Sequence, residues 1–474
     1  MTIRSIFFLL LVRLLVSATV QGGEHSLVQF AHLEHLTERI LFMGDTVDIV
    51  HVYANHPDYD WVPARESGPE GIACVDDAAR AAVVYLRHYE LTRDERSLTR
   101  AKGLLHFILK MQDPDGQFFN FVRDDHSINR HGSTSVKSFG WWAGRAIWSM
   151  SLGYRLLRTE EPGLALRLRV AIDRALPHVD SILVHYGEEE LEGGYRIPQW
   201  LFYRSAADAT TEFLLGLIEY HRASSDETIA TMIRKLARGM TVMQDGDSVT
   251  FPYGLHRSWR TSWHMWGNGQ TQALASAGAL LGDENMIGSA EREARWFYSR
   301  LLIDGFMKEM DVTLPVQKEE FEQIAYGVRP MAVGLIRLYE ATRNRDYLTM
   351  AGLAASWLMG NNVLRQQMYD PHTGRCYDGI NDSATVNLNS GAESTIEALY
   401  TVLEVEQYPE ALRCIDFRRV VVDSANGKHY ALFRNSAGDE MGLLLDPRRH
   451  GLLILEGDAM EDFLRHDGRL KEKP

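Results

Sequence analysis

Cysteine is scarce in this sequence. Only Cys74, Cys376 and Cys414 occur among 474 residues, so at most one disulfide can form and a disulfide-stapled scaffold is excluded. Their spacing matches neither a zinc ribbon nor a thiol-redox motif, and small buried apolar residues are their simplest role.

Motifs for metals and nucleotides are missing as well. No two histidines stand four residues apart, as they do in many helical metal sites. The oxygen-rich segment 370–382 lacks the EF-hand spacing, and no glycine-rich phosphate loop follows a strand pattern. The sequence therefore predicts neither a metal nor a cofactor.

Positive charge is in deficit. The 50 Lys and Arg residues face 64 Asp and Glu, which gives a formal net charge of -14. Such a chain is poorly suited to nucleic acid or to an anionic membrane surface as its main partner. An acidic sugar is not excluded, because local arginines can override the overall field.

Long apolar runs are absent beyond the N-terminus. There Arg4 precedes an apolar run over 6–16 that Arg13 interrupts, and a small-residue cleavage pattern ends at Ala18. The run is shorter than the roughly 20 residues that a membrane span needs, so it is typical of an export signal. We predict a signal peptide over residues 1–22, a secreted or periplasmic protein, and no membrane span after signal removal.

A helical pattern dominates the rest of the chain, with apolar residues three and four positions apart. Six of the predicted helices open with a small or glycine-rich polar segment and then become rich in Ala and Leu. One marker near the start of each gives intervals of 65, 66, 62, 59 and 64 residues, and the markers are Asp77, Trp142, Asp208, Gln270, Arg329 and Glu393. This near-constant period fits an inner helix, an outer helix and two connections, repeated.

More amphipathic, charged helices are predicted between the markers, for example over 95–111, 163–183 and 228–243. They suit an outer ring with one solvent-facing side, while small residues let the inner helices approach closely. We predict an all-α protein, an (α/α)6 toroid of six helical hairpins with a small C-terminal β appendage. The toroid is the catalytic domain over 26–410, and strand and turn patterns mark the β-rich appendage over 411–474.

All the predicted inner helices begin at one end of the ring, which we call the mouth. Long loops rich in glycine, aromatic and polar residues precede them, for example over 113–137 and 361–389. Binding and catalytic residues concentrate in loops that a rigid frame holds in place. The mouth is therefore the predicted site.

These features resemble the six-hairpin glycosidase superfamily over roughly residues 26–410. That superfamily comprises the (α/α)6 toroids of many glycoside hydrolases, some polysaccharide lyases and sugar epimerases. More locally, segments 74–80 (CVDDAAR), 377–380 (YDGI) and 387–395 (NLNSGAEST) look like a toroid module that also occurs beside bacterial glycosyltransferases. The resemblance implies carbohydrate chemistry without choosing a reaction.

Carboxylates are the predicted catalytic groups. Asp76 and Asp77 open the first inner helix, where backbone N–H groups and the helix dipole favour the ionised form. Glu393 opens the sixth inner helix, which lies beside the first in a closed ring although 316 residues separate it from Asp77. We predict Asp77 as the base, Glu393 as the acid, Asp208 as the reserve, and Asp76 in substrate binding. Each could instead be a purely structural helix-terminal carboxylate.

The outline is similar to glycoside hydrolase family nine, which has aspartates near the first inner helices and a glutamate near the last. Two carboxyl groups across the scissile bond are the minimum for glycoside hydrolysis. Related toroids often use a water-separated pair, so we favour an inverting arrangement.

Aromatic side chains at the mouth are predicted platforms for sugar rings, whose C–H faces stack on aromatic rings. Some, such as Trp142, could instead pack between hairpins. The predicted platforms are Trp141, Trp142, Tyr203, Trp263, Trp266 and Tyr326, and the predicted polar contacts are Asn268, Gln270 and Asn389. Arg145 and Arg329 could pair with the carboxylates or bind an acidic sugar.

The sequence favours a glycoside hydrolase that acts on an oligo- or polysaccharide with water and no cofactor. One alternative is a polysaccharide lyase or sugar epimerase that uses Tyr326, His264 and Arg329. Another is a non-catalytic glycan-binding protein. A ring-closing disulfide between Cys74 and Cys376 is a further hypothesis, and nothing in the sequence indicates the oligomeric state.

Overall fold

The structure is a computed structural model that describes residues 26–314, 318–425, 428–446 and 451–466. The predicted signal peptide, residues 1–22, lies outside these ranges. None of the described helices is both long enough and apolar enough to cross a membrane.

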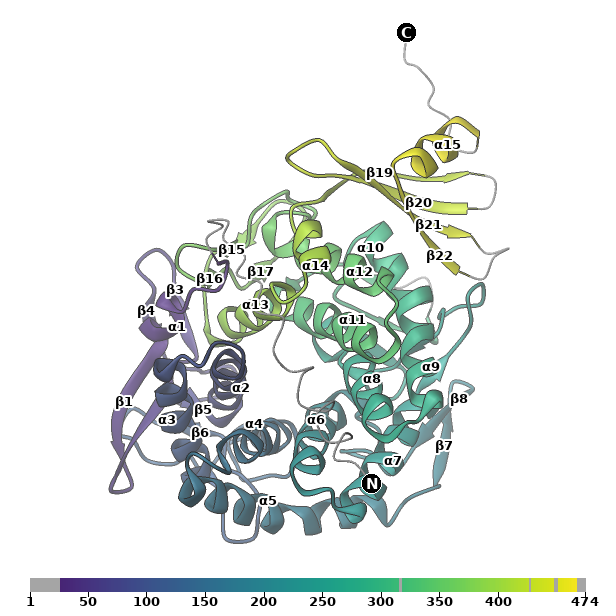
Figure 1. The fold of residues 1–474 in the computed structure, drawn as a ribbon. Coiled ribbons are helices and arrows are strands. Elements are labelled where there is room, and N and C mark those ends of the chain that lie inside the picture. The colour runs from purple at the N-terminus through teal and green to yellow at the C-terminus, as the bar shows by residue number, and fades with distance from the viewer. Residues whose placement is uncertain (1–25, 315–317, 426–427, 447–450, 467–474) are drawn as a thin grey trace, which may run out of the picture.

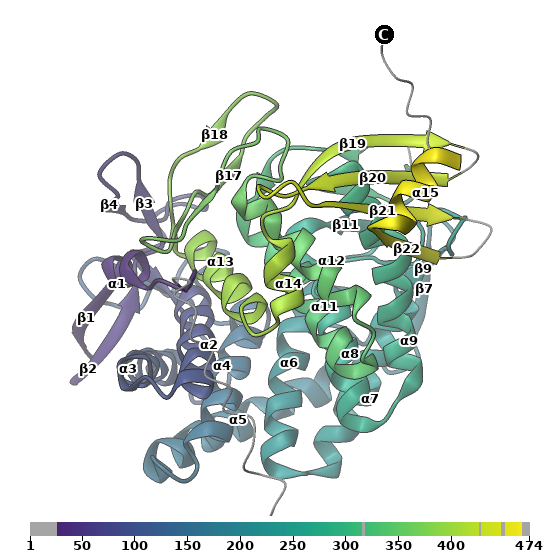
Figure 2. The same ribbon diagram turned by 45° about the horizontal axis from the view of Figure 1, so that its top comes forward.

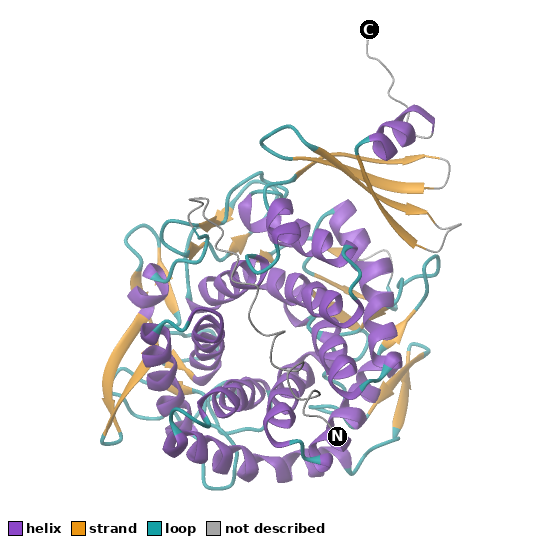
Figure 3. Ribbon diagram, viewed as in Figure 1, coloured by secondary structure: helices purple, strands orange, loops and turns teal. Residues whose placement is uncertain are grey.

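Six inner helices form a closed ring (Figures 1 and 3). Each contacts the next along the chain, and the sixth contacts the first. They are α2 (Val75–Thr92), α4 (Trp141–Leu157), α6 (Ala207–Ser224), α8 (Gln270–Leu281), α11 (Val328–Thr342) and α13 (Ala392–Val405). Each marker residue lies within the first three residues of its helix, so the predicted (α/α)6 toroid is confirmed.

The outer helices return the chain to the mouth. Asp94, Asp226 and Asp283 cap three of them by accepting hydrogen bonds from backbone N–H groups of the first turn. The outer helices are α3 (Glu95–Met111), α5 (Pro162–Leu183), α7 (Glu227–Val242), α9 (Glu284–Arg292), α12 (Asp346–Ala355) and α14 (Pro409–Cys414). After α9 the chain continues through a π-helical turn, Glu293–Tyr298, into α10 (Ser299–Asp304).

Small residues allow the inner helices to touch. A Cβ atom added at Gly216 of α6 would lie 2.8 Å from the backbone nitrogen of Trp148 in α4, and one added at Gly144 would lie 3.2 Å from the nitrogen of Phe213. Larger residues at these positions would push the two helices apart. The glycine and alanine content of the inner helices is thus explained by close packing.

Short strands lie around the ring, and the sequence pattern did not predict them. A hairpin of β1 (Thr37–Phe42) and β2 (Asp45–Val50) follows α1 (Ala31–Leu36) and packs on α3. Most of the others lie in the loops that precede inner helices, and Figure 2 shows β3, β4, β17 and β18 together at one end. These are β3 (Tyr53–Asn55), β4 (Asp60–Val62), β5 (Ala73–Cys74), β6 (Phe121–Val122), β7 (Glu189–Glu192), β8 (Tyr195–Pro198), β9 (Gln244–Asp245), β10 (Leu255–His256), β11 (Ser262–His264), β12 (Glu309–Asp311), β13 (Lys318–Glu319), β14 (Gln323–Ile324), β15 (Tyr369–Asp370), β16 (Arg375–Cys376), β17 (Gly379–Ile380) and β18 (Val386–Asn387).

The C-terminal part contains the predicted β appendage. Four antiparallel strands in the order β19-β20-β21-β22 are followed by α15 (Asp458–His466). One face of the sheet joins the core of the toroid through Phe433 and Met441, while the other packs Tyr430 and Leu444 against Phe463 of α15. The strands are β19 (Arg418–Ala425), β20 (Lys428–Arg434), β21 (Glu440–Asp446) and β22 (Gly451–Glu456).

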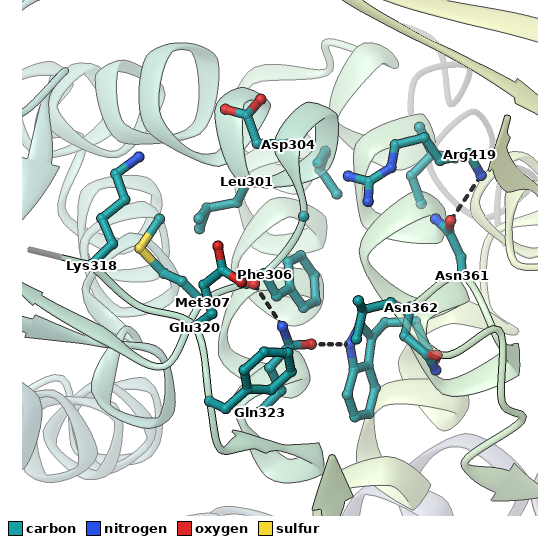
Figure 4. Close-up of a pocket in the computed structure, with 16 residues that line it drawn as sticks. Leu301, Asp304, Phe306, Met307, Lys318, Glu320, Gln323, Asn361, Asn362 and Arg419 are labelled. Carbon is teal, nitrogen blue, oxygen red and sulfur yellow. Dashed lines mark hydrogen bonds between the residues drawn. The ribbon is translucent and has the colours of Figure 1, made fainter. Parts of the chain in front are cut away.

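A small cavity of about 160 Å³ marks the junction between the sheet and the toroid (Figure 4). Its polar groups bond to one another: Arg419 Nη1 donates to the Ile303 carbonyl over 2.7 Å, and the Arg419 backbone N–H donates to Asn361 Oδ1 over 2.8 Å. Gln323 donates to the Phe306 carbonyl over 2.8 Å. These bonds tie the first strand of the sheet to the fourth and fifth hairpins.

The three cysteines are all free and buried. The hypothesis of a ring-closing Cys74–Cys376 disulfide is therefore wrong. Cys376 packs in the main core, whereas Cys74 belongs to a small separate cluster with Val52 and Phe121.

A belt of ion pairs surrounds the far end of the ring, at the C-terminal halves of the inner helices. Glu404 of α13 is fully buried between Arg87 of α2 and Arg337 of α11, at 2.6 and 2.8 Å. The belt continues from Arg87 through Glu90, Arg155 and Glu219 to Arg222, with successive pairs 2.8 Å apart or closer. A polar cavity of about 380 Å³ lies within this belt. The belt links α13, α2, α4, α6 and α11.

Candidate active site

A cavity of about 350 Å³ opens at the mouth, where the inner helices begin. Its wall combines carboxylates, two arginines and aromatic rings from the first, second, fourth, fifth and sixth hairpins. The lining residues are Val52, Tyr53, Glu66, Glu70, Cys74, Asp76, Asp77, Arg80, Asn120, Phe121, Thr134, Trp141, Trp142, Arg145, Trp266, Tyr326 and Glu393. We refer to it as the mouth cavity.

The start of α2 sets the position of the two aspartates. The Cys74 sulfur caps the helix by accepting from the Asp77 backbone N–H, and β5 pairs with β6 just before it. Gly71 permits this pairing, since a Cβ atom there would lie 2.2 Å from the Val122 carbonyl oxygen. The segment Gly71–Cys74 therefore directs Asp76 and Asp77 into the mouth cavity.

Arg80, one turn further along α2, gathers the carboxylates. Its Nη1 atom lies 3.0 Å from Asp77 and 3.4 Å from Asp76, and it also contacts Glu393. Its Nε atom lies 3.2 Å from Glu397. Because Asp77 and Glu393 bond to the same nitrogen, their nearest oxygens are no more than about 6 Å apart, two hydrogen bonds end to end.

The two aspartates differ in charge state. Burial, and after it the charge of Glu393, raises the pKa of Asp77 to about 7, against the opposing effect of Arg80. Burial also disfavours ionisation of Asp76, but Arg145 and Arg80 outweigh it and lower the pKa of that carboxyl. Arg145 Nη1 donates to both Asp76 oxygens, over 2.5 and 2.7 Å. At neutral pH, Asp76 is therefore ionised, whereas Asp77 is partly protonated.

Glu393 is the most accessible member of this group. Its side chain is 37% exposed, whereas that of Asp77 is 2% exposed. A bound molecule can therefore touch Glu393 directly, whereas little of the Asp77 side chain is accessible to it.

Aromatic rings form the sides of the mouth cavity. Trp141 lies over the Arg145 guanidinium at 5.3 Å, and Tyr326 faces Arg80 at 5.8 Å. Trp266 is half-buried and stacks on His264, with ring centroids 4.2 Å apart. Trp142 is buried and donates to the Phe118 carbonyl over 2.7 Å, so it packs between hairpins as well as lining the wall.

Asp208 lies behind this wall. It is 4% exposed, and its Oδ2 atom lies 2.9 Å from His264 Nε2. Burial raises the pKa of Asp208, while its bond to His264 opposes that effect. Neither Asp208 nor His264 lines the mouth cavity, so the structure does not give Asp208 the reserve catalytic position that the sequence suggested. Asp208 instead bonds to His264, whose ring stacks on Trp266.

Several other predicted site residues also lie away from the mouth cavity. Trp263, Asn268 and Gln270 are fully buried: Trp263 packs on Phe297, and Asn268 accepts a bond from Tyr298. Gln270 donates to the Gly267 carbonyl at the start of its own helix.

Arg329, Asn389 and Tyr203 are placed differently. Arg329 sits deeper in the ring, bonded to Glu397, Gln272 and Glu212. Asn389 accepts from the His56 backbone in a mouth loop, and Tyr203 is 53% exposed beside Gly140. Position near a helix start did not predict which way these side chains point.

The sequence analysis missed Tyr53, Glu66 and Glu70. They come from the segment before the first inner helix, which contains the β3–β4 hairpin and a turn. Burial, followed by the charge of Glu66, raises the pKa of Tyr53, and Glu393 adds to the effect. The sequence contained the signal for these residues, because this segment precedes an inner helix just as the other mouth loops do.

Replacing Trp266 by Ala is expected to weaken binding of any ligand that stacks on this ring roughly tenfold, because an indole face is lost from the wall of the mouth cavity. Titration of a substrate identified by turnover would measure the effect. Trp61→Ala is the matched control, since Trp61 stacks on His51 and is 42% exposed but does not line the mouth cavity. Equal loss in both variants would contradict a specific role for Trp266.

Asp77→Asn is expected to stabilise the protein at pH 8 and to have little effect near pH 4. The folded pKa of about 7 exceeds the unfolded value, so the wild type loses stability as pH rises from about 4 to 7. The neutral amide avoids that loss, on the order of 4 kcal/mol at pH 8 for a pKa raised from 3.8 to about 7. Urea unfolding at both pH values tests this, and a variant less stable than wild type at pH 8 would contradict it.

Comparisons with known proteins place the fold. No protein-family model matches the chain, and no curated protein matches it by sequence. Solved structures similar to this chain include cellobiose 2-epimerase from Spirochaeta thermophila DSM 6192, with a TM-score of 0.56 and 13% identity over 82% of this chain and 94% of that one. Cellobiose 2-epimerase from Bacillus thermoamylovorans B4167 gives a TM-score of 0.55 and 10% identity over 80% and 96%. A D-mannose isomerase gives 0.51 and 11% over 76% and 91%.

At these identities the likeness establishes the toroid fold and nothing finer. The resemblance to a module beside bacterial glycosyltransferases stays a prediction. Activity has to be argued from the side chains of the mouth cavity.

Proposed function

We propose that this chain is a carbohydrate-active enzyme, a glycoside hydrolase that cleaves an oligo- or polysaccharide in the mouth cavity. The observation that supports this proposal is the Asp77–Glu393 pair. Two carboxyl groups share one guanidinium nitrogen, and one of them has a pKa of about 7, inside an aromatic-walled cavity. Such a pair can hold one proton at neutral pH and give it up during a reaction.

In the proposed reaction, the pair protonates the leaving-group oxygen as the glycosidic C–O bond breaks. Glu393 is the member that can reach the substrate, and Asp77 stores the proton in the resting enzyme. Asp76 is ionised but already paired with Arg145, so the proposed reaction gives it no separate charge to supply. Water adds its hydroxyl to the anomeric carbon and returns its proton to the pair, so the products are a new reducing end, which is a hemiacetal, and an alcohol.

The spacing of this pair disagrees with the inverting arrangement favoured from the sequence. Inverting enzymes separate their carboxyl groups by roughly 6.5–9.5 Å to leave room for water. Asp77 and Glu393 are closer, because both bond to Arg80. A short spacing is typical of retaining enzymes, in which the second carboxylate attacks the anomeric carbon. The Asp77 side chain is only 2% exposed, so the spacing excludes the inverting arrangement for this pair without supplying that nucleophile.

A lyase or epimerase built on Tyr326, His264 and Arg329 receives less support. Burial and the charge of Glu393 raise the pKa of Tyr326, so its phenol is a poor base. His264 lies behind Trp266, and Arg329 is already bonded to Glu397, Gln272 and Glu212. The three groups do not meet around the mouth cavity.

We also propose a secreted or periplasmic location, on the basis of the sequence of residues 1–22. Purification from the exported fraction, followed by determination of the N-terminal residue, would test it. An N-terminus that retains residues 1–22 would contradict the proposal.

Release of reducing ends from a panel of glycans tests the enzymatic proposal, with NMR of the products to detect epimerised or unsaturated sugars. Hydrolysis by the wild type and its loss in Glu393→Gln would support it. Epimerised sugars would favour an epimerase, and products that absorb in the ultraviolet would favour a lyase. Binding of a glycan without any turnover would favour the non-catalytic alternative.

A further inference from the structure

The mouth cavity carries an excess of negative charge. Five carboxyl groups line it, against two guanidinium groups: Glu66, Glu70, Asp76, Asp77 and Glu393 against Arg80 and Arg145. No lysine or histidine lines it. The charge of a ligand should therefore matter for binding here.

Neither arginine is free to bind an acidic ligand. Arg80 is 5% exposed and contacts Asp76, Asp77, Glu393 and Glu397. Arg145 is 6% exposed, and its Nη1 atom donates to both oxygens of Asp76. A carboxylate or sulfate on a sugar would meet no uncommitted cation.

The carboxylates, in contrast, are not all neutralised. Asp76 is held by Arg145, and Glu70 is buried and accepts from the Thr134 hydroxyl. Glu393 is 37% exposed, and Glu66 is exposed and forms no ion pair among the described residues. Glu66 and Glu393 each contribute to raising the pKa of the Tyr53 phenol. Glu66, Glu393 and Tyr53 all line the mouth cavity, which therefore presents two accessible carboxylates and one phenol ring.

We propose that the mouth cavity selects sugars by charge and takes a sugar with a protonated amino group in preference to neutral or acidic sugars. Glu66 is the residue that distinguishes them. An ammonium group beside an accessible carboxylate forms a charge-assisted hydrogen bond, while an acidic sugar meets like charge with no compensating cation. This inference rests on the proposed function for the identity of the site, and it concerns binding and not turnover.

Three monosaccharides of the same ring configuration provide the test: D-glucosamine, D-glucose and D-glucuronate. Their dissociation constants are measured by NMR titration at pH 6.5 and low salt, where the amine is protonated. We expect glucosamine to bind roughly two- to fivefold more tightly than glucose, and glucuronate more weakly than glucose. Added salt should reduce the preference, because it screens partly exposed charges.

Glu66→Gln should remove most of the glucosamine preference, because it keeps the size of the side chain and removes its charge. Asp180→Asn is the matched control: Asp180 is an exposed acid on the outer helix α5, away from the mouth cavity, and its loss should leave the preference unchanged. Glucosamine that does not bind, or binds no better than glucose, would overturn the inference. A preference that survives in Glu66→Gln would overturn it as well.

The binding test and the hydrolysis test fail independently. A preference for glucosamine without turnover of any glycan would support charge-selective binding and contradict the proposal of a glycoside hydrolase. Hydrolysis of a neutral glycan, with no preference for glucosamine in the binding test, would support the hydrolase and contradict charge-selective binding.

Discussion

Replacing Glu393 by Gln is expected to lower kcat/KM on a cleaved glycan by about 100- to 10,000-fold, the range typical of lost proton transfer. The amide keeps the shape of the side chain and can still contact Arg80, but it can neither accept nor donate the proton that the pair holds. The variant should remain folded, since Glu393 is partly exposed at a helix start. Initial rates of reducing-end release measure the effect.

Asp180→Asn serves again as the control for a lost surface carboxylate, and circular dichroism checks the fold of each variant. Wild-type turnover by Glu393→Gln would show that the Asp77–Glu393 pair is not the catalytic site. Asp76 would then be the next candidate, since it is the ionised carboxylate of the same cavity.

The toroid could be predicted because its signals are local and repeated. Helix starts at Trp142, Asp208 and Gln270 were located within one or two residues, since the change from polar loop to Ala-rich helix is visible in the sequence. The closure of the ring followed from the number of repeats. The short strands were missed because two or three residues, as in β5 and β6, are too few to show an alternating pattern.

The candidate site was only partly predictable. Asp77 and Glu393 could be placed on adjacent helices from the period alone, yet their shared contact with Arg80 depends on side-chain packing inside the ring. The same is true of Gln270, which begins an inner helix but turns toward its own backbone. A helix start fixes where a residue lies, and its neighbours decide where its side chain points.

The ion-pair belt at the far end gave no signal in the sequence, because the pairs that link one helix to another join different hairpins. Arg87 and Glu404 are 317 residues apart and meet only when the ring closes. Burial disfavours ionisation of Glu404, but Arg337 and Arg87 outweigh it and lower its pKa. Closure of the ring therefore brings the partners of the belt together, and their ion pairs in turn stabilise the closed ring.

Replacing Glu404 by Gln is expected to lower the free energy of unfolding by about 3 kcal/mol at pH 7, the lower end of the range for a broken buried pair. Glu404 is fully buried, but the guanidinium groups that lose it, those of Arg87 and Arg337, are 21% and 13% exposed. Glu340→Gln is the matched control: it also bonds to Arg337, but its side chain is 34% exposed, so a loss of about 1 kcal/mol or less is expected. Urea unfolding at pH 7 measures both.

The pH dependence of that difference identifies its cause. The folded pKa of Glu404 is lowered, so its stabilising contribution is complete above the unfolded pKa, near 4, and is lost as pH falls through the folded value. The gap between wild type and Glu404→Gln should therefore be constant from pH 8 to 5 and shrink below about pH 4. A gap that persists at lower pH would indicate lost packing and not lost charge.

The belt lies at the opposite end of the ring from the mouth cavity. Binding of glucosamine by the folded Glu404→Gln variant should therefore equal that of the wild type. Weaker binding would mean that ring closure at the far end also sets the geometry of the mouth.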